Sequence, residues 1–456
     1  MLDDVLDDVL DATTRYAASI LADLPTRPVV PGGDTTTPEP LALPVTGMGF
    51  DGALDLFTRR WAPGFSGSAG PRYLGFVTGG STPAAIAGDW LATAFDQNPA
   101  ASDGSSAPDL ERETVRWLAS MFGLGDEHSG AFVSGATMSN FVGLALAREW
   151  LGEQAGVSVA QAGVGALGSV KVYSGAPHSS VYKALSMLGL GRDSLRPVPT
   201  LPGREAIDVS RLAAELDGTP AVVVANAGTV NTVDFDDLRA ILELRARNPF
   251  WLHVDAAFGG FAALAPDHAH LVDGLNEADS VCVDLHKWLN VPYDSAIQFT
   301  RRRDLQVDVF RNSAAYLGLP TGNPDFVHLT PENSRRLRAL AAWFTLTAHG
   351  QDGHRRIVER CVDLARRLGD LLADTPGVRL LAPVRLNVVC FTLADSPTPE
   401  RVAEAARRIA AHGETFLTPT VYNGQPALRA AFSNWRTRPA DLAAIYGAIA
   451  DACDGL

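Results

Sequence analysis

The chain has 456 residues, 46% hydrophobic and 20% charged, which is typical of a globular protein with room for two or three structural units. Its net charge of −14 at pH 7 argues against nucleic acid or an anionic membrane as a partner. No apolar run is long enough for a membrane span, and the acidic start MLDDVLDDVLDA lacks the cationic segment and apolar run of a signal peptide. The four cysteines have no metal-binding spacing, so we expect reduced thiols, no metal site and a cytoplasmic protein.

Residues 1–80 are expected to form a helical and extended segment. Leu2, Leu6 and Leu10 fall on one face of a helix whose opposite face is lined with aspartates. Residues 25–44 are rich in proline, threonine and glycine, which predicts an extended linker.

Residues 81–352 alternate short apolar runs with amphipathic ones, which predicts an α/β domain with a mainly parallel sheet flanked by helices. Residues 353–456 predict a small α+β domain that begins with a long helix. The predicted strands of the first domain are Val170–Tyr173, Ala221–Ala225, Trp251–Asp255, Val281–Asp284 and Ala296–Thr300; the second has helices Arg355–Leu372 and Pro399–His412 and strands Leu386–Leu393 and Ala427–Ser433.

The chain contains only three lysines among its 38 basic residues, namely Lys171, Lys183 and Lys287. A lysine amine can form a Schiff base with a carbonyl, whereas an arginine guanidinium cannot. Lys287 follows a predicted strand, and Asp255 ends the strand before it in the chain. Ligands of open α/β sheets bind at the carboxyl ends of the strands, so this pair predicts a cofactor site.

Several motifs that follow one another in the sequence indicate a protein family with this kind of cofactor site. HVDAAFGG at 253–260 is followed by DLHKWLNVPYDSA at 284–296, and SGATMSNFVGLALARE at 134–149 and APHSSVYKA at 176–184 precede them. Together with ANAGTVNTVDFDDL, SRRLRALAAWFTLTAHG and LRAAFSNWRT, they resemble the group II amino-acid decarboxylases that depend on pyridoxal 5'-phosphate (PLP), the aromatic-amino-acid and glutamate decarboxylase group. The resemblance spans roughly residues 54–437. It implies the fold-type I architecture, PLP as cofactor, and a homodimer whose N-terminal helices clasp the partner subunit.

The resemblance also implies roles for individual residues. Lys287 would hold PLP as a Schiff base, and Asp255 would keep the pyridine nitrogen protonated. His178 would stack on the ring and orient the carboxylate that is lost. The phosphate would lie on the turn at the start of a helix, at Gly135, Ala136 and Thr137.

Four further residues are expected around the cofactor. His286 would contact the phosphate, Ala257 would leave room for the second face of the ring, and Thr229 would reach the phenolic oxygen. Asp284 departs from the family pattern, because several relatives carry an asparagine that touches the phosphate. A carboxylate repels phosphate, so we expect Asp284 to point elsewhere or to accept a hydrogen bond.

The catalytic loop is where the resemblance fails. Members of the family carry a tyrosine in this loop that protonates the carbanion after CO₂ leaves. Counting back without gaps from Arg335 places Phe326 at the position of that tyrosine. Phenylalanine donates no proton, so three alternatives remain open. Tyr316 or His328 donates the proton and the product is an amine; the carbanion meets O₂ and the product is an aldehyde; or the reaction is a β-elimination from a cysteine-type substrate.

The substrate pocket is also altered. Phe76 and Thr78, together with Tyr316 and His328, are the residues predicted to line it, and the preceding segment lacks a tryptophan that aromatic decarboxylases carry. Arg429 either binds a carboxylate or forms a structural ion pair.

We therefore predict a cytoplasmic homodimeric PLP enzyme that acts at Cα of an L-amino acid and releases CO₂. The alternatives are a catalytically inactive binding scaffold and an aminotransferase, which would need Arg429 in its pocket.

Overall fold

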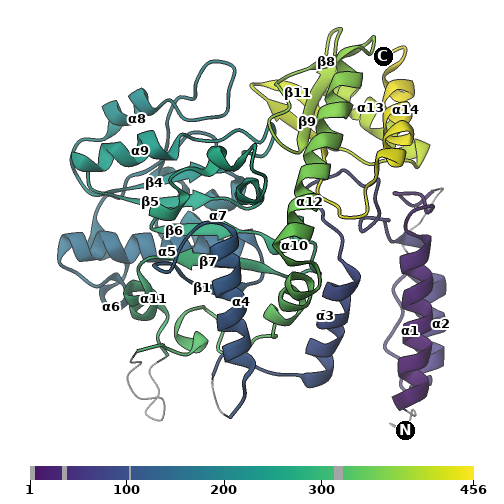
Figure 1. Ribbon diagram of the computed structural model, residues 1–456, viewed down its shortest axis with the longest axis horizontal. Coiled ribbons are helices and arrows are strands. Elements are labelled where there is room, and N and C mark those ends of the chain that lie inside the picture. The colour runs from purple at the N-terminus through teal and green to yellow at the C-terminus, as the bar shows by residue number, and fades with distance from the viewer. Residues whose placement is uncertain (1–5, 33–37, 102–103, 313–321) are drawn as a thin grey trace.

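The computed structural model describes residues 6–32, 38–101, 104–312 and 322–456 (Figure 1). Tyr316, one of the predicted pocket residues, lies outside these ranges. The central element is a seven-stranded sheet of order β1-β7-β6-β5-β4-β2-β3. Only β7 runs antiparallel to its neighbours β1 and β6, so the sheet is mainly parallel, as predicted. The strands are β1 (Ser129–Val133), β2 (Val172–Ser174), β3 (Leu195–Pro197), β4 (Ala221–Asn226), β5 (Phe250–Asp255), β6 (Ser280–Val283) and β7 (Ala296–Thr300).

Helices cover both faces of this sheet because its strands are apolar on both sides. In β4, Val222 and Val224 pack with α5 and α7, whereas Val223 faces the larger core on the opposite side. The helices around the sheet are α3 (Pro83–Phe95), α4 (Ala107–Met121), α5 (Ala136–Ala155), α6 (Val159–Ala162), α7 (Ser179–Met187), α8 (Val209–Glu215), α9 (Leu238–Glu243), α10 (Leu285–Trp288) and α11 (Arg303–Phe310).

A second, four-stranded antiparallel sheet of order β10-β11-β9-β8 forms the C-terminal part (Figure 1). It contains β8 (Val378–Leu380), β9 (Val388–Leu393), β10 (Thr418–Tyr422) and β11 (Gln425–Ala431), with α13 (Pro399–His412) and α14 (Leu442–Cys453). The 35-residue α12 (Ala339–Ala373) connects this part to the large sheet and is interrupted at Gly350, whose φ of 60° and ψ of 179° are not helical. The boundary expected between residues 352 and 353 therefore falls inside α12, just after the interruption.

The N-terminal helices α1 (Leu6–Asp23) and α2 (Gly49–Arg60) lie side by side at the edge of the molecule, away from the large sheet (Figure 1). Tyr16 of α1 and Phe57 of α2 make an edge-to-face contact with ring centroids 6.4 Å apart. The described residues between the two helices form no helix or strand, in line with the predicted linker. Neither helix has a buried residue, and Leu6 and Leu10 are 68% and 53% exposed.

Across the described ranges, no helix is both long and apolar enough to cross a bilayer. The same residues include no cluster of three or more histidine, cysteine, aspartate or glutamate side chains suited to a metal ion. All four cysteines are buried and unpaired.

Candidate active site

A cavity of about 340 Å³ opens at the carboxyl ends of the central strands. Four chain segments that follow strands β1, β4, β5 and β6 line it, and segment 76–77, the start of α7 and strand β11 complete the wall. The lining includes ten of the predicted site residues: Phe76, Gly135, Ala136, Thr137, His178, Thr229, Asp255, Ala257, His286 and Lys287; it also includes Arg429. The sheet topology brings these segments together because parallel strands end at the same edge.

Lys287 lies on α10, directly after β6, and its amine is partly exposed to the cavity. Its Nζ lies 3.2 Å from Oδ2 of Asp284, which is also 3.2 Å from Nε2 of His286. Gly79 lets the chain pass close to this helix, because a Cβ there would lie 1.6 Å from the carbonyl oxygen of Lys287.

Asp284 is almost fully buried and accepts hydrogen bonds, as expected. Burial alone would raise its pKa, but the charge of Lys287 and hydrogen bonds from His286 and Lys287 outweigh burial and hold the pKa below its usual value. Its second oxygen, Oδ1, is buried without a hydrogen-bond partner among the described residues.

Asp255, the last residue of β5, is 6% exposed and lines the cavity. Its Oδ2 accepts a hydrogen bond of 2.8 Å from Nδ2 of Asn140 on α5, and its Oδ1 accepts one of 3.2 Å from the backbone N–H of Ala257. These donors fix the orientation of the carboxylate.

His178 caps the N-terminus of α7, and its Nδ1 accepts a 3.2 Å hydrogen bond from the backbone N–H of Ser180. The pKa of His178 is lowered chiefly by burial, and Lys287 and Arg429 lower it further, while Asp255 and Asp284 oppose the shift. The ring is therefore biased toward the neutral form.

The start of α5 provides an anion site at the same edge. Its N-cap residue, Gly135, supplies no side-chain acceptor for the first N–H groups of this 20-residue helix, which begins Ala136-Thr137. Such groups and the helix dipole favour a phosphate. A Cβ added at Gly135 would meet only Cε1 of His286, at 3.6 Å, so the turn leaves room for a ligand.

Thr229 lines the cavity, but its hydroxyl is engaged within the chain. It donates a 2.6 Å hydrogen bond to Glu205 and accepts a 2.9 Å bond from the backbone N–H of Asp234. Its only hydroxyl hydrogen is therefore engaged by Glu205 in this structure.

Arg429 of β11 contributes a buried guanidinium to the cavity, 6% exposed. Its NH1 and NH2 donate to the carbonyl oxygens of Val230 and Phe76, and its Nε has no hydrogen-bond partner among the described residues. Burial lowers the pKa of this guanidinium from its usual value. Of the two roles predicted for Arg429, a structural ion pair is not formed in the described chain.

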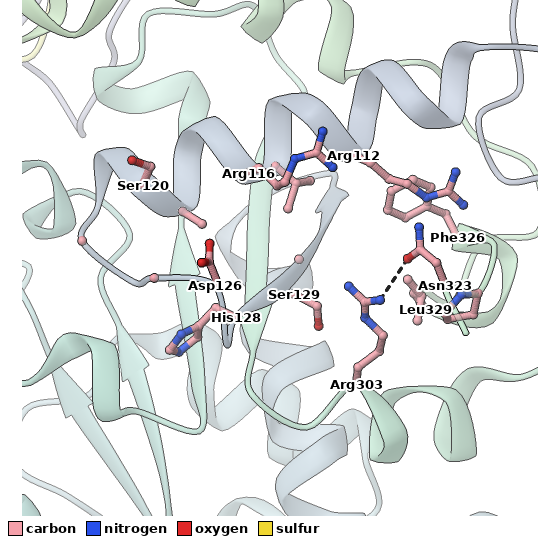
Figure 2. Close-up of a pocket in the computed structure, with 16 residues that line it drawn as sticks. Arg112, Arg116, Ser120, Asp126, His128, Ser129, Arg303, Asn323, Phe326 and Leu329 are labelled. Atoms are coloured by element: carbon pink, nitrogen blue, oxygen red, sulfur yellow. Dashed lines mark hydrogen bonds between the residues drawn. The ribbon is translucent and has the colours of Figure 1, made fainter. Parts of the chain in front are cut away.

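Three predicted residues lie elsewhere. Thr78 is buried and donates only a weak 3.4 Å hydrogen bond to Gly75, and His328 is buried and accepts a 3.1 Å bond from the backbone N–H of Asn312. Phe326 is 2% exposed and borders a different pocket, near the start of β1 (Figure 2). Its ring lies 5.5 Å from the guanidinium carbon of Arg112 and 5.1 Å from that of Arg335. Within one chain, none of these three lines the Lys287 cavity.

Several residues around the cavity were not anticipated from the sequence. Tyr293 and Asn226 line it, and the ring of Tyr293 lies 4.2 Å from that of His286. Asn140, Ser180 and His253 form a hydrogen-bonded layer beneath Asp255 and His178. The alternation of side chains in β5 gave a signal for His253, because it lies two residues before Asp255 and so faces the same side.

The cavity fits PLP in each of its polar parts. A lysine amine is available for the aldehyde, a buried carboxylate for the pyridine nitrogen, and the free N–H groups at the start of α5 for the phosphate. Asp284 is held by Lys287 and His286, so its charge is compensated beside the phosphate site.

Comparison with known proteins agrees with this chemistry. A family model described as "Pyridoxal-dependent decarboxylase conserved domain" matches residues 54–394. The aromatic-L-amino-acid decarboxylase of Bacillus atrophaeus is 29% identical over 384 residues, which cover 80% of this chain and 78% of that protein.

Two solved structures share the fold of the whole chain. The crystal structure of Oryza sativa TDC with PLP and tryptamine has a TM-score of 0.91 at 23% identity, and coverage is 99% of each chain. The crystal structure of Rhodiola rosea 4-hydroxyphenylacetaldehyde synthase has a TM-score of 0.86 at 20% identity, with 99% of each chain covered. Because the family model matches most of its length, the chain belongs to the pyridoxal-dependent decarboxylase family: its cofactor is PLP, and its activity is the decarboxylation of an amino acid.

Proposed function

We propose that the Lys287 cavity is the catalytic site of this decarboxylase and that its product is the amine. The observation that carries the proposal is the convergence of Lys287, Asp255 and His178 on one cavity beside the free N-terminus of α5. When bound, PLP withdraws electrons from Cα of an amino acid, and the protein decides which bond of Cα breaks.

Each of the three residues has a distinct task in this proposal. Lys287 holds the cofactor through its amine until the substrate amine replaces it. Asp255, oriented by Asn140 and the N–H of Ala257, keeps the pyridine nitrogen protonated. His178 would lie against the cofactor and would position the carboxylate of the substrate, which favours loss of CO₂.

The position of Phe326 weakens the argument for an aldehyde product. An aldehyde product requires Phe326 to stand where a proton donor should act, but its ring is buried between Arg112 and Arg335, outside the cavity of its own chain. Tyr316 remains the loop residue with a hydroxyl. We infer that the carbanion is protonated and that the amine is released.

Arg429 favours a substrate with a second anionic group. A buried guanidinium that donates only to two carbonyl oxygens has no compensating charge in direct contact, so an anion entering the cavity would be strongly stabilised. An aminotransferase would also use an arginine here, but the family match supports a decarboxylase. Arg429→Met should raise KM most for acidic amino acids, and Arg429→Lys should restore part of the loss.

The exposed N-terminal helices support a homodimer. Leu6, Leu10 and Leu43 are 68%, 53% and 91% exposed, which is costly for a helix pair and linker that face only water. A second copy of the chain that packs against these residues would remove the cost. Light scattering should give twice the chain mass, and a monomer that is active would exclude the dimer as a requirement.

The test of the proposed function is product analysis of PLP-loaded protein with a panel of L-amino acids, acidic ones and S-substituted cysteines included. CO₂ and amine in equal amounts, without O₂ uptake, is the expected result. Aldehyde with O₂ uptake would replace the amine by oxidative deamination. Pyruvate without CO₂ would overturn decarboxylation for this chain.

A further inference from the structure

A series of buried hydrogen bonds runs beneath the cavity floor and connects four elements. It begins at Trp251 and His253 on β5, passes Ser280 on β6 and Asn140 on α5, and ends at Asp255 and at the His178–Ser180 turn of α7. Trp251, Asn140, His253 and Ser280 are each at most 1% exposed, so none exchanges these bonds for water. Buried polar networks of this kind are costly unless every member is satisfied.

The direction of the first bonds follows from the donors available. The indole N–H of Trp251 can only donate, and it lies 2.9 Å from Oγ of Ser280. The hydroxyl hydrogen of Ser280 is thus free for Nδ1 of His253, at 2.8 Å. Because a hydroxyl oxygen can also accept two hydrogen bonds, the direction is decided at Nε2 of His253, which faces the amide oxygen of Asn140 and must donate to it; a neutral His253 therefore carries its hydrogen on Nε2 and accepts at Nδ1.

Asn140 links His253 to Asp255 and to Ser180, so the series of hydrogen bonds divides into two branches at this residue. The carboxylate of Asp255 can only accept, so the amide nitrogen of Asn140 faces it at 2.8 Å, and the amide oxygen faces Nε2 of His253 at 2.9 Å. The second amide hydrogen is directed to Oγ of Ser180, at 3.0 Å.

The second branch determines the tautomer of His178. Oγ of Ser180 accepts from Asn140, so its own hydrogen is available for Nδ1 of His178, 2.7 Å away. The backbone N–H of Ser180 donates to the same nitrogen at 3.2 Å. Nδ1 receives two donors and can carry no hydrogen, so a neutral His178 has its hydrogen on Nε2, which has no partner among the described residues.

We propose that Asn140 is a positioning residue that, through Ser180, fixes His178 with an Nε2–H available to the substrate carboxylate and, through its second hydrogen, holds Asp255 for the pyridine nitrogen. The proposal rests on the proposed function of the Lys287 cavity. One amide thereby sets both the residue that selects the bond and the residue that keeps the cofactor electron-poor. A donor at Nε2 is required because a carboxylate accepts hydrogen bonds only.

The packing around the ring of His253 also supports a defined hydrogen-bond network. Gly143 lies one turn after Asn140 on α5, and a Cβ there would lie 2.6 Å from both Cε1 and Nδ1 of the His253 ring. Only glycine leaves room for the ring to reach Asn140 and Ser280 together. Gly143→Ala should therefore displace His253 without changing any polar atom of the network.

The charges that face His178 do not settle the tautomer by themselves. Asp255 and Asp284 favour the protonated ring, whereas Lys287 and Arg429 oppose it. Two carboxylates and two cations act in opposite directions, which leaves the hydrogen bonds from Ser180 to decide which nitrogen carries the hydrogen.

The test is solid-state ¹⁵N NMR of histidine-labelled, cofactor-free full-length protein, with His178→Gln to assign the signals. In the wild type we expect an unprotonated Nδ1 and a protonated Nε2 for His178. Asn140→Leu should mix the tautomers and weaken PLP binding at least tenfold, as measured by absorbance titration. Ser180→Ala should disturb the tautomer while changing the PLP dissociation constant less than threefold.

Ser139→Ala is the matched control, because Ser139 precedes Asn140, is equally buried, and donates to the carbonyl of Ile297 outside the network. It should leave both readouts unchanged. If Asn140→Leu fails to fold, Asn140→Ala removes both donors without placing a second carboxylate beside Asp255, and the same shifts are expected. Wild-type signals and affinity in a folded Asn140 variant would overturn the proposal. Failure of the wild type to bind PLP would instead overturn the proposed function, because the tautomer is read without cofactor.

Discussion

The two ends of strand β1 carry two pockets of different character. At its N-terminal end, Phe326, Arg112 and Arg303 border a pocket of about 550 Å³ (Figure 2), and past its C-terminal end the Lys287 cavity measures about 340 Å³. Near the larger pocket, Arg335 is 1% exposed at its side chain and makes two hydrogen bonds of 2.8 and 2.7 Å to Glu111.

In the smaller cavity, by contrast, the buried guanidinium of Arg429 has no ion-pair partner among the described residues. Nε of Arg429 and Oδ1 of Asp284 are both buried without a hydrogen bond among the described residues. A buried charge without a counter-charge costs free energy that an anionic ligand can recover, so it indicates a binding site better than volume does. The comparison predicts that changes near Phe326 affect stability and that changes near Lys287 affect chemistry.

The largest effect is expected for Lys287→Arg. The substitution keeps a positive charge beside Asp284 but removes the amine that can hold the cofactor, so the rate of CO₂ release should fall at least about 10³-fold. The measurement is single-turnover decarboxylation, together with the visible absorbance of the PLP-loaded protein. Lys183→Arg is the control and should retain wild-type rates. Substantial activity in Lys287→Arg would show that this cavity is not the catalytic site.

Glu111→Gln should give the largest loss of stability. It leaves the guanidinium of Arg335 buried without its charge partner, which costs about 3–5 kcal/mol when one member of a buried pair is removed. Urea unfolding measures the change, and PLP affinity of the folded fraction should stay close to wild type. A tenfold loss of PLP affinity with unchanged stability would contradict the division between the two pockets.

The sequence was sufficient for the parts of the site that lie in contiguous motifs. Lys287 follows one recognisable apolar strand and Asp255 ends another, and parallel topology then brings them together. The layer of Asn140, Ser180 and His253 could not be inferred, because its members come from three elements whose packing no local pattern specifies.

The position of the Phe326 side chain also could not be predicted from the sequence. Counting along the chain placed it at the position of a catalytic tyrosine, but the count carries no information about the direction of a side chain. The burial of Phe326 under two guanidinium groups follows from the position of Arg112 on α4 and of Arg335 just before α12, and the contact with Arg112 spans more than 200 residues of sequence.

An intermediate effect is expected from pH, through the histidine beneath the cavity. Burial lowers the pKa of His253 to about 4, compared with 6.5 in the unfolded chain. Between these values the unfolded chain binds more protons, so the contribution of His253 to stability is present above pH 6.5 and is lost as the pH falls toward 4. From pH 7 to pH 5 the wild type should lose about 2 kcal/mol more than His253→Gln. Urea unfolding of cofactor-free protein at both pH values measures the difference, and equal losses would mean that His253 is protonated or exposed in the folded chain.

The smallest effect is expected for Phe326→Tyr, which distinguishes the two pockets most directly. If Phe326 took the place of the proton donor, a hydroxyl there would convert an aldehyde-forming enzyme into an amine-forming one, and O₂ uptake would disappear. Because the ring is 2% exposed and lies between Arg112 and Arg335, outside the Lys287 cavity, we expect the products to stay the same and kcat to change less than about threefold. The added oxygen needs space in a packed cluster with Ala131 and Leu329, so a loss of about 1–3 kcal/mol in stability is the expected consequence. A change of product in the folded variant would bring Phe326 into the chemistry, either by loop movement or through the site of a partner subunit, whereas a change in stability alone keeps the two ends of β1 separate.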